Sequence, residues 1–361
     1  MTSHIDILRD LVAFDTRNGT GDEVACVAWL RDRLAAHAPD RIVMERVPRS
    51  RGKSDSAFVL AVWGRPDTLL NVHIDTVPSG EGWTADPLSL QLRDGRAYGL
   101  GTSDIKGAAA AILSALDEGR PSHAAILLSG DEEHGSEVMP AVIARGQLEG
   151  VKRAVVCEPT SCRVGRAHRG MLGFSAHYSG PGGHSSLSDT TPAPLLSAAR
   201  FTSMLGDYKE RHAGFGSEPF QGLCVNIGDM RSDGSYNVIP TTASAWVSMR
   251  PPPGDDVDRR ETDLLEMARK TDADVKTDTL VKFVPFSSLD PQAFSPVFTE
   301  EPIVDLPYWT EAAMLSAAGI NCVVYGPGDL EQAHRPDEYV SVAQLDAARA
   351  RYGALLSGAL S

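Results

Sequence analysis

Uninterrupted apolar runs mark the strands that the chain is expected to form in its first half and near its end. They read "TLLNVHID" (68–75), "AAILLSGDEE" (124–133), "RAVVCEPT" (153–160) and "INCVVYGPG" (320–328). Runs of this kind, without the alternation of a half-exposed strand, are typical of strands that are buried on both faces. They therefore predict a largely parallel sheet.

Helical patterns separate these runs. The segment "GAAAAILSALDEG" (107–119) is rich in alanine, the best helix former. The N-terminal segment places four apolar residues on one helical face: Ile5, Leu8, Leu11 and Val12. Strands that alternate with helices predict an α/β fold with a mixed, largely parallel sheet flanked by helices.

The middle of the chain has a different pattern. Strand patterns there read "LGFSAHYSG", "LCVNIGDM", "TASAWVSMR" and "LVKFVPF". Helical patterns stand at 192–214 and again where Val257, Leu264, Leu265 and Ala268 share one face. The order β-α-β-β-α-β is that of a ferredoxin-like α+β unit. We expect it to be inserted as residues 172–287 between two parts of the larger domain, 1–171 and 288–361.

Histidine and acidic residues gather where the predicted strands end. These residues are His73, Asp75, Glu132, Glu133 and Glu158, with Asp104 just ahead of the alanine-rich helix and His334 after the last strand. In open α/β sheets, ligands bind beyond the carboxyl ends of the strands. The pattern therefore predicts that these side chains meet at one edge of the sheet.

Each of these residues also has a structural interpretation when it is taken alone. Asp104 could cap the following helix, and Glu158 could mark a strand exit before Pro159. His73 and His334 could be hydrogen-bonded structural residues, and the adjacent acids could form a solvated turn. Their coincidence at one edge favours a site for a divalent metal, because zinc and cobalt accept imidazole and carboxylate together.

The adjacent acids Glu132 and Glu133 cannot ligate one ion equivalently, since successive residues leaving a strand point in opposite directions. One can bind metal while its neighbour faces the water that the metal activates and serves as the base of a hydrolysis reaction. The spacing of His73 and Asp75 fits a ligand and the carboxylate that orients its imidazole.

Length, charge and cysteine content limit the remaining possibilities. The 361 residues suggest about two domains, and the formal charge of −14 argues against a nucleic-acid partner. We expect no membrane span, since no run of 18 apolar residues occurs, and no signal peptide at the N-terminus. Five scattered cysteines suit a reduced, cytoplasmic compartment, and we expect none of them to bind metal.

Five stretches in this order resemble the motifs of the dizinc aminoacylase and carboxypeptidase family: "NVHIDTVP", "GLGTSDIKGAAAA", "GDEEHGS", "EPT" and "GPGDLEQAHRPDEY". The resemblance covers nearly the whole chain and implies a dizinc exopeptidase-like fold. Within the family, "WTEA" (309–312) and the last stretch are most similar to the acetylornithine deacetylase branch, which includes acetylcitrulline deacetylases.

The resemblance implies a role for each residue at the sheet edge. His73, Asp104 and Glu158 would hold a first divalent ion, and Asp104 would bridge to a second ion held by Glu133 and His334. Glu132 would be the general base and Asp75 the residue that orients His73. The two ions would be zinc, with cobalt as the other possibility.

The resemblance also assigns roles in the inserted domain. It implies that this domain forms a homodimer and that His184 in "SGPGGHSS" helps to stabilise the tetrahedral intermediate, although His184 alone could be a surface turn residue. Asn237 and Arg250 occupy places where relatives hold substrate, and Arg250 suits a carboxylate. Arg169 in "AHRG" is a further candidate for substrate binding, or else a salt bridge at the domain boundary.

The expected function is removal of the acetyl group from N-acetyl-L-ornithine or N-acetyl-L-citrulline in arginine biosynthesis. A succinyl-diaminopimelate desuccinylase or a dipeptidase or carboxypeptidase would share the same metal site, and "WTEA" weighs against both. A protein that only binds metal would not need Glu132. Phosphoryl transfer is disfavoured because the chain lacks a G-x-x-x-x-G-K-[ST] loop and two histidines favour zinc over magnesium.

Overall fold

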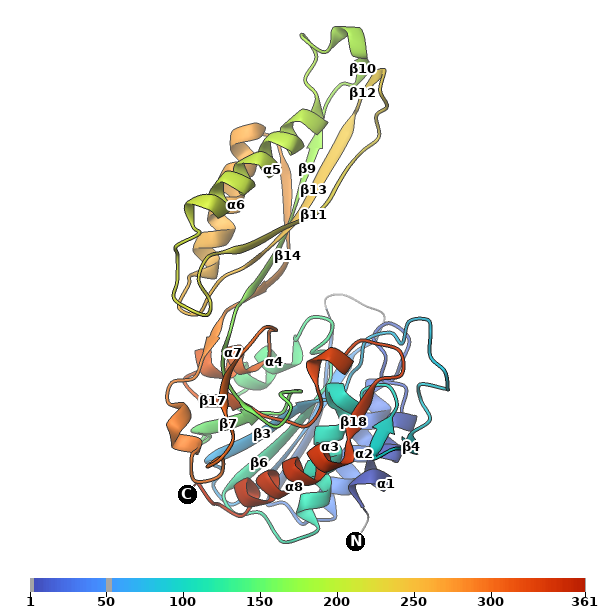
Figure 1. Ribbon diagram of the computed structural model, residues 1–361, viewed down its shortest axis with the longest axis vertical. Helices are drawn as coiled ribbons and strands as arrows, with labels where there is room; N and C mark the ends of the chain where they lie inside the picture. Colours follow the sequence, from blue (N-terminus) through green and yellow to red (C-terminus); the bar gives the residue numbers. More distant parts are fainter. Residues whose placement is uncertain (1–2, 50–53, 361) are drawn as a thin grey trace. The chain divides into compact units, whose positions relative to one another are not determined.

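The computed structural model describes residues 3–49 and 54–360, which form two compact units (Figure 1). The larger unit comprises residues 1–166, 288–306 and 310–361, and the inserted unit comprises 167–287 and 307–309. Each unit has a hydrophobic core of its own.

The larger unit is built on a mixed sheet. In spatial order its strands are β1 (Arg41–Val47), β2 (Ser56–Trp63), β6 (Ala124–Ser129), β3 (Thr68–His73), β7 (Arg153–Val156), β17 (Asn321–Val324) and β8 (Val164–His168), with β16 (Ile303–Leu306) also paired to β8. The central strands β6, β3, β7 and β17 run parallel, whereas β1 and β2 are antiparallel. The mixed, largely parallel sheet that the apolar runs predict is confirmed.

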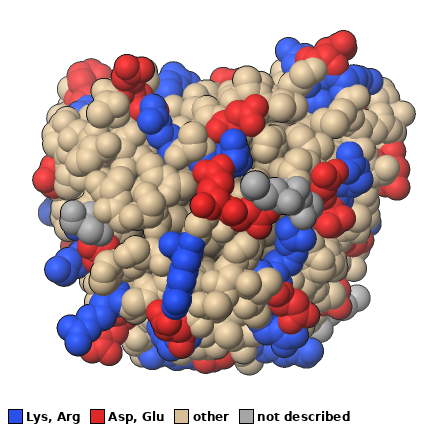
Figure 2. All heavy atoms as spheres, turned by 90° about the horizontal axis from the view of Figure 1, so that it is seen from below, with Lys and Arg blue, Asp and Glu red and all other residues tan. Residues whose placement is uncertain are grey.

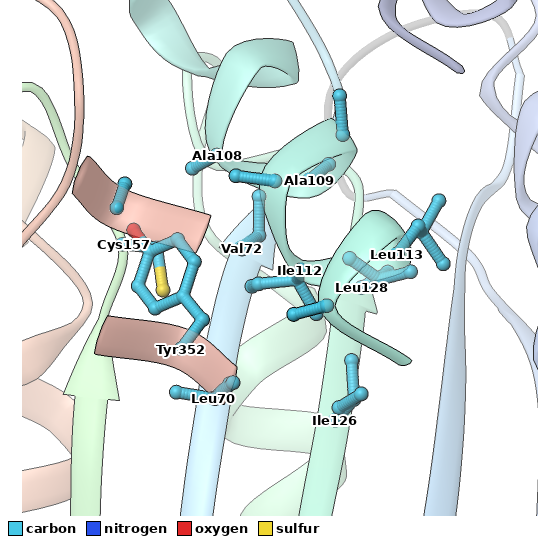
Figure 3. Packing of buried hydrophobic residues seen from close by; sticks show 14 of the residues in the cluster. Leu70, Val72, Ala108, Ala109, Ile112, Leu113, Ile126, Leu128, Cys157 and Tyr352 are labelled. Atoms are coloured by element: carbon cyan, nitrogen blue, oxygen red, sulfur yellow. The ribbon is translucent and has the colours of Figure 1, made fainter. Parts of the chain in front are cut away.

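Helices flank this sheet. They are α1 (His4–Ala13), α2 (Glu23–Ala35), α3 (Gly107–Leu116), α4 (Val138–Ala144), α7 (Ala312–Ala317) and α8 (Val342–Leu356). Helices α1, α2, α3 and α8 share one hydrophobic cluster with alternate residues of β2, β3 and β6. Helices α4 and α7 contact each other and the strands β2 and β7. Every residue of α3 is buried, and its small side chains let its backbone pack closely against α1 and α8. Figure 3 shows Ile112 of this helix in one hydrophobic cluster with Val72 of β3 and Leu128 of β6.

A small sheet stands beside this core. It consists of β18 (Tyr339–Ser341), β5 (Arg96–Tyr98) and β4 (Gln91–Arg93). Strand β18 follows the "GPGDLEQAHRPDE" stretch, and β5 precedes the loop that carries Asp104. The pairing of these two strands therefore brings two motifs more than 200 residues apart in the chain close together.

The inserted unit is a ferredoxin-like α+β fold, as the sequence predicts. Its elements are β9 (Met171–Ser179), α5 (Pro194–Arg211), β11 (Cys224–Ser232), β13 (Thr242–Arg250), α6 (Val257–Thr271) and β14 (Lys276–Phe283). The strands form an antiparallel sheet in the order β11-β13-β9-β14, with both helices against one face (Figure 1). A two-residue ribbon, β10 (Gly183–His184) paired with β12 (Val238–Ile239), extends from it.

The division between the units differs from the expected one at its first boundary. The inserted unit begins at Ala167 rather than at 172, because β8 continues into a pairing with β15 (Phe286–Ser287) within that unit. Residues 307–309 also belong to it, since the Trp309 ring stacks on Phe283 at 4.1 Å and its Nε1 donates to the Val284 carbonyl. The hydrophobic pattern of the sequence does not indicate that residues 307–309 belong to the inserted unit.

Charged side chains of both signs share one face of the protein. On the face shown in Figure 2, Lys and Arg are interspersed with Asp and Glu, and neither sign dominates. Among the described residues, no helix has the length and apolar character that crossing a bilayer requires.

Candidate metal centre and active site

The first cluster forms where two parallel strands end. His73 is the last residue of β3, and Glu158 follows its neighbour β7 by two residues. The Nε2 atom of His73 lies 3.6 Å from an oxygen of Glu158 and 3.2 Å from Oδ1 of Asp104. His73 and Glu158 are buried. One ligand atom from each of the three residues lies within 4.8 Å of the others, so the three could hold one metal ion.

The second cluster shares Asp104 with the first. The Nε2 atom of His334 lies 2.7 Å from Oε1 of Glu133 and 3.4 Å from Oδ2 of Asp104. These three residues also meet the 4.8 Å criterion for a metal site. Asp104 stands in the turn Thr102–Lys106, which leads into α3, so one carboxylate faces both clusters with its two oxygens.

Asp75 connects the first cluster to the acidic turn. Its carboxylate accepts hydrogen bonds from the backbone N–H groups of Glu132 and Glu133, each at 3.1 Å, and from Nδ2 of Asn18 at 3.0 Å. The Nδ1 atom of His73 lies 3.1 Å from the Asp75 carbonyl and 3.5 Å from Oδ1 of its carboxylate. Asp75 therefore lies beside the imidazole and also accepts a hydrogen bond from the backbone that carries Glu132.

A buried ion network supports the acidic turn. Asp131, with a φ of +74°, accepts a hydrogen bond from the Glu137 N–H and lies 2.9 Å from Nε of Arg49. Arg49 also pairs with Glu23, whose other oxygen accepts a hydrogen bond from Ser56 at 2.6 Å. The first of the three consecutive acids thus faces an arginine and not the two clusters.

Electrostatics at the site favour a bound cation. Burial raises the pKa of Glu132 well above its usual value and raises that of Glu158 to about 7. Hydrogen bonds to Asp104 and Glu133 raise the pKa of His334 to about 10. Burial opposes a charged His73, but the charge of Glu158 and hydrogen bonds to Asp104 and Asp75 outweigh it and raise its pKa. The crowded carboxylates therefore favour the protonated, positively charged form of the two imidazoles beside them.

Divalent cations fit this donor set. Without metal, protonated imidazoles supply the positive charge that the carboxylates attract. Zinc and cobalt bind neutral imidazole and carboxylate together, so either ion would replace those protons. The two histidines and three carboxylates of the two clusters thus suit two such ions, with Asp104 available to both.

The metal-free protein is expected to lose stability as pH rises from about 4.5 to 7. The folded-state pKa of Glu158 is raised from 4.5 to about 7. A carboxyl group whose pKa is higher in the folded than in the unfolded protein stabilises the folded state. This contribution is complete at pH values below the unfolded-state pKa and is lost as the pH rises through the folded-state pKa. The loss should be on the order of 1–3 kcal/mol. Thermal unfolding in chelator measures it.

The matched control is Glu158→Gln, which removes the titrating group but keeps nearly the same volume. Its metal-free form should lose less stability over the same pH range. Added zinc should reverse the trend in the wild type, because deprotonated ligands bind metal more tightly as pH rises. Equal pH dependence of variant and wild type would contradict the assignment of this effect to Glu158.

The structure brings His184 close to Asn237. Strand β10 pairs with β12, so that His184 lies opposite Val238, and the Ser185 N–H donates to the Asn237 carbonyl at 3.1 Å. The His184 side chain is exposed, and its Nδ1 lies 2.8 Å from the Ser186 hydroxyl. These candidate substrate residues occupy one end of the inserted unit.

Arg250 lies at the other end of that unit. Strand β13 runs from Thr242, opposite Ser179, to Arg250, a distance of about 26 Å at ~3.3 Å per residue. The Arg250 guanidinium has no hydrogen-bonding partner among the described residues and lines a cavity of about 810 Å³ together with Lys209 and Asn226. Within one chain, His184 and Arg250 are therefore too far apart to contact the same small substrate.

The Arg169 guanidinium is held by backbone carbonyl groups of the inserted unit. Its guanidinium donates to the carbonyls of Gly222 at 2.7 Å, Gln221 at 3.1 Å and Arg250 at 3.2 Å. Guanidinium N–H groups that already donate to backbone carbonyls are not available to bind a substrate carboxylate. The geometry favours the structural alternative for Arg169, although as a tie to backbone groups and not as the salt bridge considered from the sequence.

The sequence assigns no role to several residues around the clusters. Asn18 and Arg49 reach the site from segments far away in the chain, and Glu338 belongs to the stretch "GPGDLEQAHRPDEY" that carries His334. Glu311 of "WTEA" is buried at the start of α7, and burial raises its pKa to about 8. An acid within an apolar stretch, such as Glu311, is a signal that could have indicated a buried role.

Known proteins share both the sequence pattern and the fold. The model of peptidase family M20/M25/M40 matches residues 69–357. The N-acetyl-L-citrulline deacetylase of Xanthomonas campestris pv. campestris is 34% identical over 357 residues, which cover 96% of this chain and 95% of that protein. The acetylornithine deacetylase of Proteus mirabilis is 29% identical over 335 residues, covering 87% and 85%.

Solved structures are similar in fold at low identity. An M20 family metallo-carboxypeptidase from Sulfolobus solfataricus superposes with a TM-score of 0.78 at 15% identity, covering 99% of both chains. A dinuclear metal-binding peptidase of the M20 family from Bacillus subtilis gives 0.68 at 16% identity, covering 98% of this chain and 96% of that one.

The fold and the family match define a hydrolase of the metallopeptidase type. The chain belongs to peptidase family M20/M25/M40. The family resemblance inferred from the five motifs is thereby confirmed.

Proposed function

We propose that the protein is a metal-dependent deacetylase that hydrolyses N-acetyl-L-citrulline or N-acetyl-L-ornithine. The observation that carries the proposal is the pair of clusters that share Asp104, with Glu132 held beside them by Asp75. Similarity to deacetylases of these two substrates supports the choice of substrate. Their names also support a place in arginine biosynthesis, and we expect the protein to act in the cytoplasm.

Two divalent ions, zinc or cobalt, would be the cofactors. His73, Asp104 and Glu158 would hold one ion, and Asp104, Glu133 and His334 would hold the other. Such ions polarise a substrate carbonyl and lower the pKa of water towards neutrality. The chain's own residues must then position the substrate and move the protons.

Glu132 is proposed to be the general base. Burial and the charge of Glu158 raise its pKa, and a raised pKa suits a carboxylate that accepts a proton and later donates it. In amide hydrolysis, Glu132 would take a proton from the attacking water and return it to the nitrogen of the leaving amine. Asp75, which binds the backbone N–H of Glu132, holds the base in place for both steps.

The inserted unit is proposed to supply substrate contacts and a homodimer interface. His184 would donate to the developing oxyanion, Asn237 would contact the substrate, and the Arg250 guanidinium would bind the α-carboxylate through paired hydrogen bonds. Exposed apolar side chains on β11 and β13, Ile227, Met230 and Trp246, support a partner at this sheet, because an uncovered edge strand readily pairs with another chain.

A substrate panel tests the function. With zinc or cobalt added, amine release from acetylcitrulline and acetylornithine should exceed that from acetylglutamate, succinyl-diaminopimelate and dipeptides. A chelator should abolish the activity, and added metal should restore it. The panel also identifies the acyl amino acid that fits best. Faster turnover of succinyl-diaminopimelate or of dipeptides would replace the proposed activity with one of its two alternatives.

A further inference from the structure

Glu338 is a buried carboxylate that, in the described part of the chain, accepts hydrogen bonds from the backbone N–H groups of one loop. It lies four residues after His334 and is 1% exposed. Its Oε2 accepts a hydrogen bond from the Gly101 N–H at 2.8 Å. Its Oε1 accepts from the N–H groups of Ser103 at 2.7 Å and Asp104 at 3.0 Å. Three donors from four consecutive residues thus converge on one side chain.

This loop depends on a tight conformation. Gly101 has a φ of +78°, and a Cβ atom there would lie 2.7 Å from Cγ2 of Thr76. A side chain at this position would therefore be strained and crowded. The loop ends at Asp104, whose two oxygens face His73 and His334. A small rotation of the loop would misplace both oxygens together.

We propose that Glu338 is a positioning residue that sets Asp104 in place for both metal positions before any ion binds. The inference rests on the metal centre proposed above. Glu338 anchors the Asp104 loop to the segment that also carries His334, so one buried carboxylate aligns the shared ligand with a ligand of the second cluster. Groups behind metal ligands commonly change metal affinity by about 10–100-fold when they are altered.

A purely structural role makes a different prediction. A buried acid that only stabilises the fold would, on substitution, lower the melting temperature without changing metal affinity in the folded protein. Glu338→Gln separates the two roles. The glutamine carbonyl oxygen can still accept from Ser103 and Asp104, but its amide N–H₂ would face the Gly101 N–H, so one of the three hydrogen bonds is lost.

Zinc titration against a competing chelator measures the effect directly. Wild type should bind two ions per chain, and Glu338→Gln should weaken both binding steps by about 10–100-fold. His334→Ala should weaken mainly one step, since His334 belongs to one cluster. The matched control is Glu301→Gln, an acid of the same unit that pairs with Arg351, which should leave both steps unchanged.

The outcomes distinguish this inference from the proposed function. A wild type that binds fewer than two ions would overturn the metal centre itself. Two binding steps in the wild type that persist unchanged in Glu338→Gln would overturn only the role of Glu338. Weakening of a single step would likewise contradict it, since Asp104 faces both clusters.

Hydrogen exchange decides the question even if the variant does not fold. In chelator-treated wild type, the amides of Gly101, Ser103 and Asp104 should remain protected, because Glu338 and not the metal accepts their hydrogen bonds. Exchange of these amides on metal removal, while the amides of β3 stay protected, would show that the ion orders the loop and would overturn the inference.

Discussion

Glu132→Gln is expected to bind two divalent ions like the wild type and to lose about 10²–10⁴-fold of its turnover number. The substitution keeps the size and hydrogen-bonding shape of the side chain but removes the basic oxygen. The backbone N–H of residue 132 can still donate to Asp75, so the turn should keep its geometry. Steady-state deacetylation and metal analysis of the same sample measure both quantities.

Two control variants separate the base from the ligands. Glu133→Gln and His73→Ala should lose metal together with activity, since each belongs to one of the clusters. Glu132→Gln with full metal content and near wild-type turnover of both acetylated substrates would show that another group is the base. Loss of metal in that variant would instead make Glu132 a ligand.

His184→Ala is expected to bind metal normally and to lose about 10²–10³-fold of turnover, the usual effect of removing a donor to a developing oxyanion. We expect the imidazole to serve the site of a second copy. His184 lies at the end of the inserted unit that is remote from Met171, where the chain enters the sheet, and about 26 Å along β13 from Arg250. One small substrate cannot contact both residues of one chain.

Mixing two inactive variants tests this arrangement. Subunit exchange between His184→Ala and Glu132→Ala should produce heterodimers in which one site has an intact Glu132 and the partner's intact imidazole. Activity should then return, although each parent is nearly inactive. Exchange that is demonstrated by mass spectrometry without recovered activity would place His184 at its own chain's site. Normal turnover of His184→Ala would exclude it from catalysis.

The positions of acidic and histidine residues at strand ends predict part of the site, because neighbouring parallel strands end at the same edge of the sheet. His73 and Glu158 meet because β3 and β7 are parallel neighbours, and the carboxyl ends of such strands lie at one edge. Asp104 and His334 reach the same edge from loops that follow the strand pattern, whereas the assignment of each to one or both ions came from the resemblance of whole motifs. The inserted fold was predictable because its two helices and four strands have separate periodicities.

Contacts between distant segments could not be predicted in this way. Asn18 reaches Asp75 across 57 positions, and Glu338 reaches Ser103 across 235, with no periodic pattern to relate them. The letters of the sequence do not distinguish Asp131 from the two acids that follow it, but its φ is positive and its carboxylate lies 2.9 Å from Nε of Arg49. The separation of His184 from Arg250 depends on strand pairing, which hydrophobicity does not specify.

Asp75 contacts both the first cluster and the turn that carries Glu132 and Glu133. Its carboxylate holds the backbone of Glu132 and Glu133, while its carbonyl and one carboxylate oxygen lie beside the imidazole of His73. A substitution at residue 75 should therefore disturb the imidazole and the acidic turn together. Two motifs that are separate in the chain thus share one point of failure, and position 75 should tolerate replacement less well than its place outside the two clusters suggests.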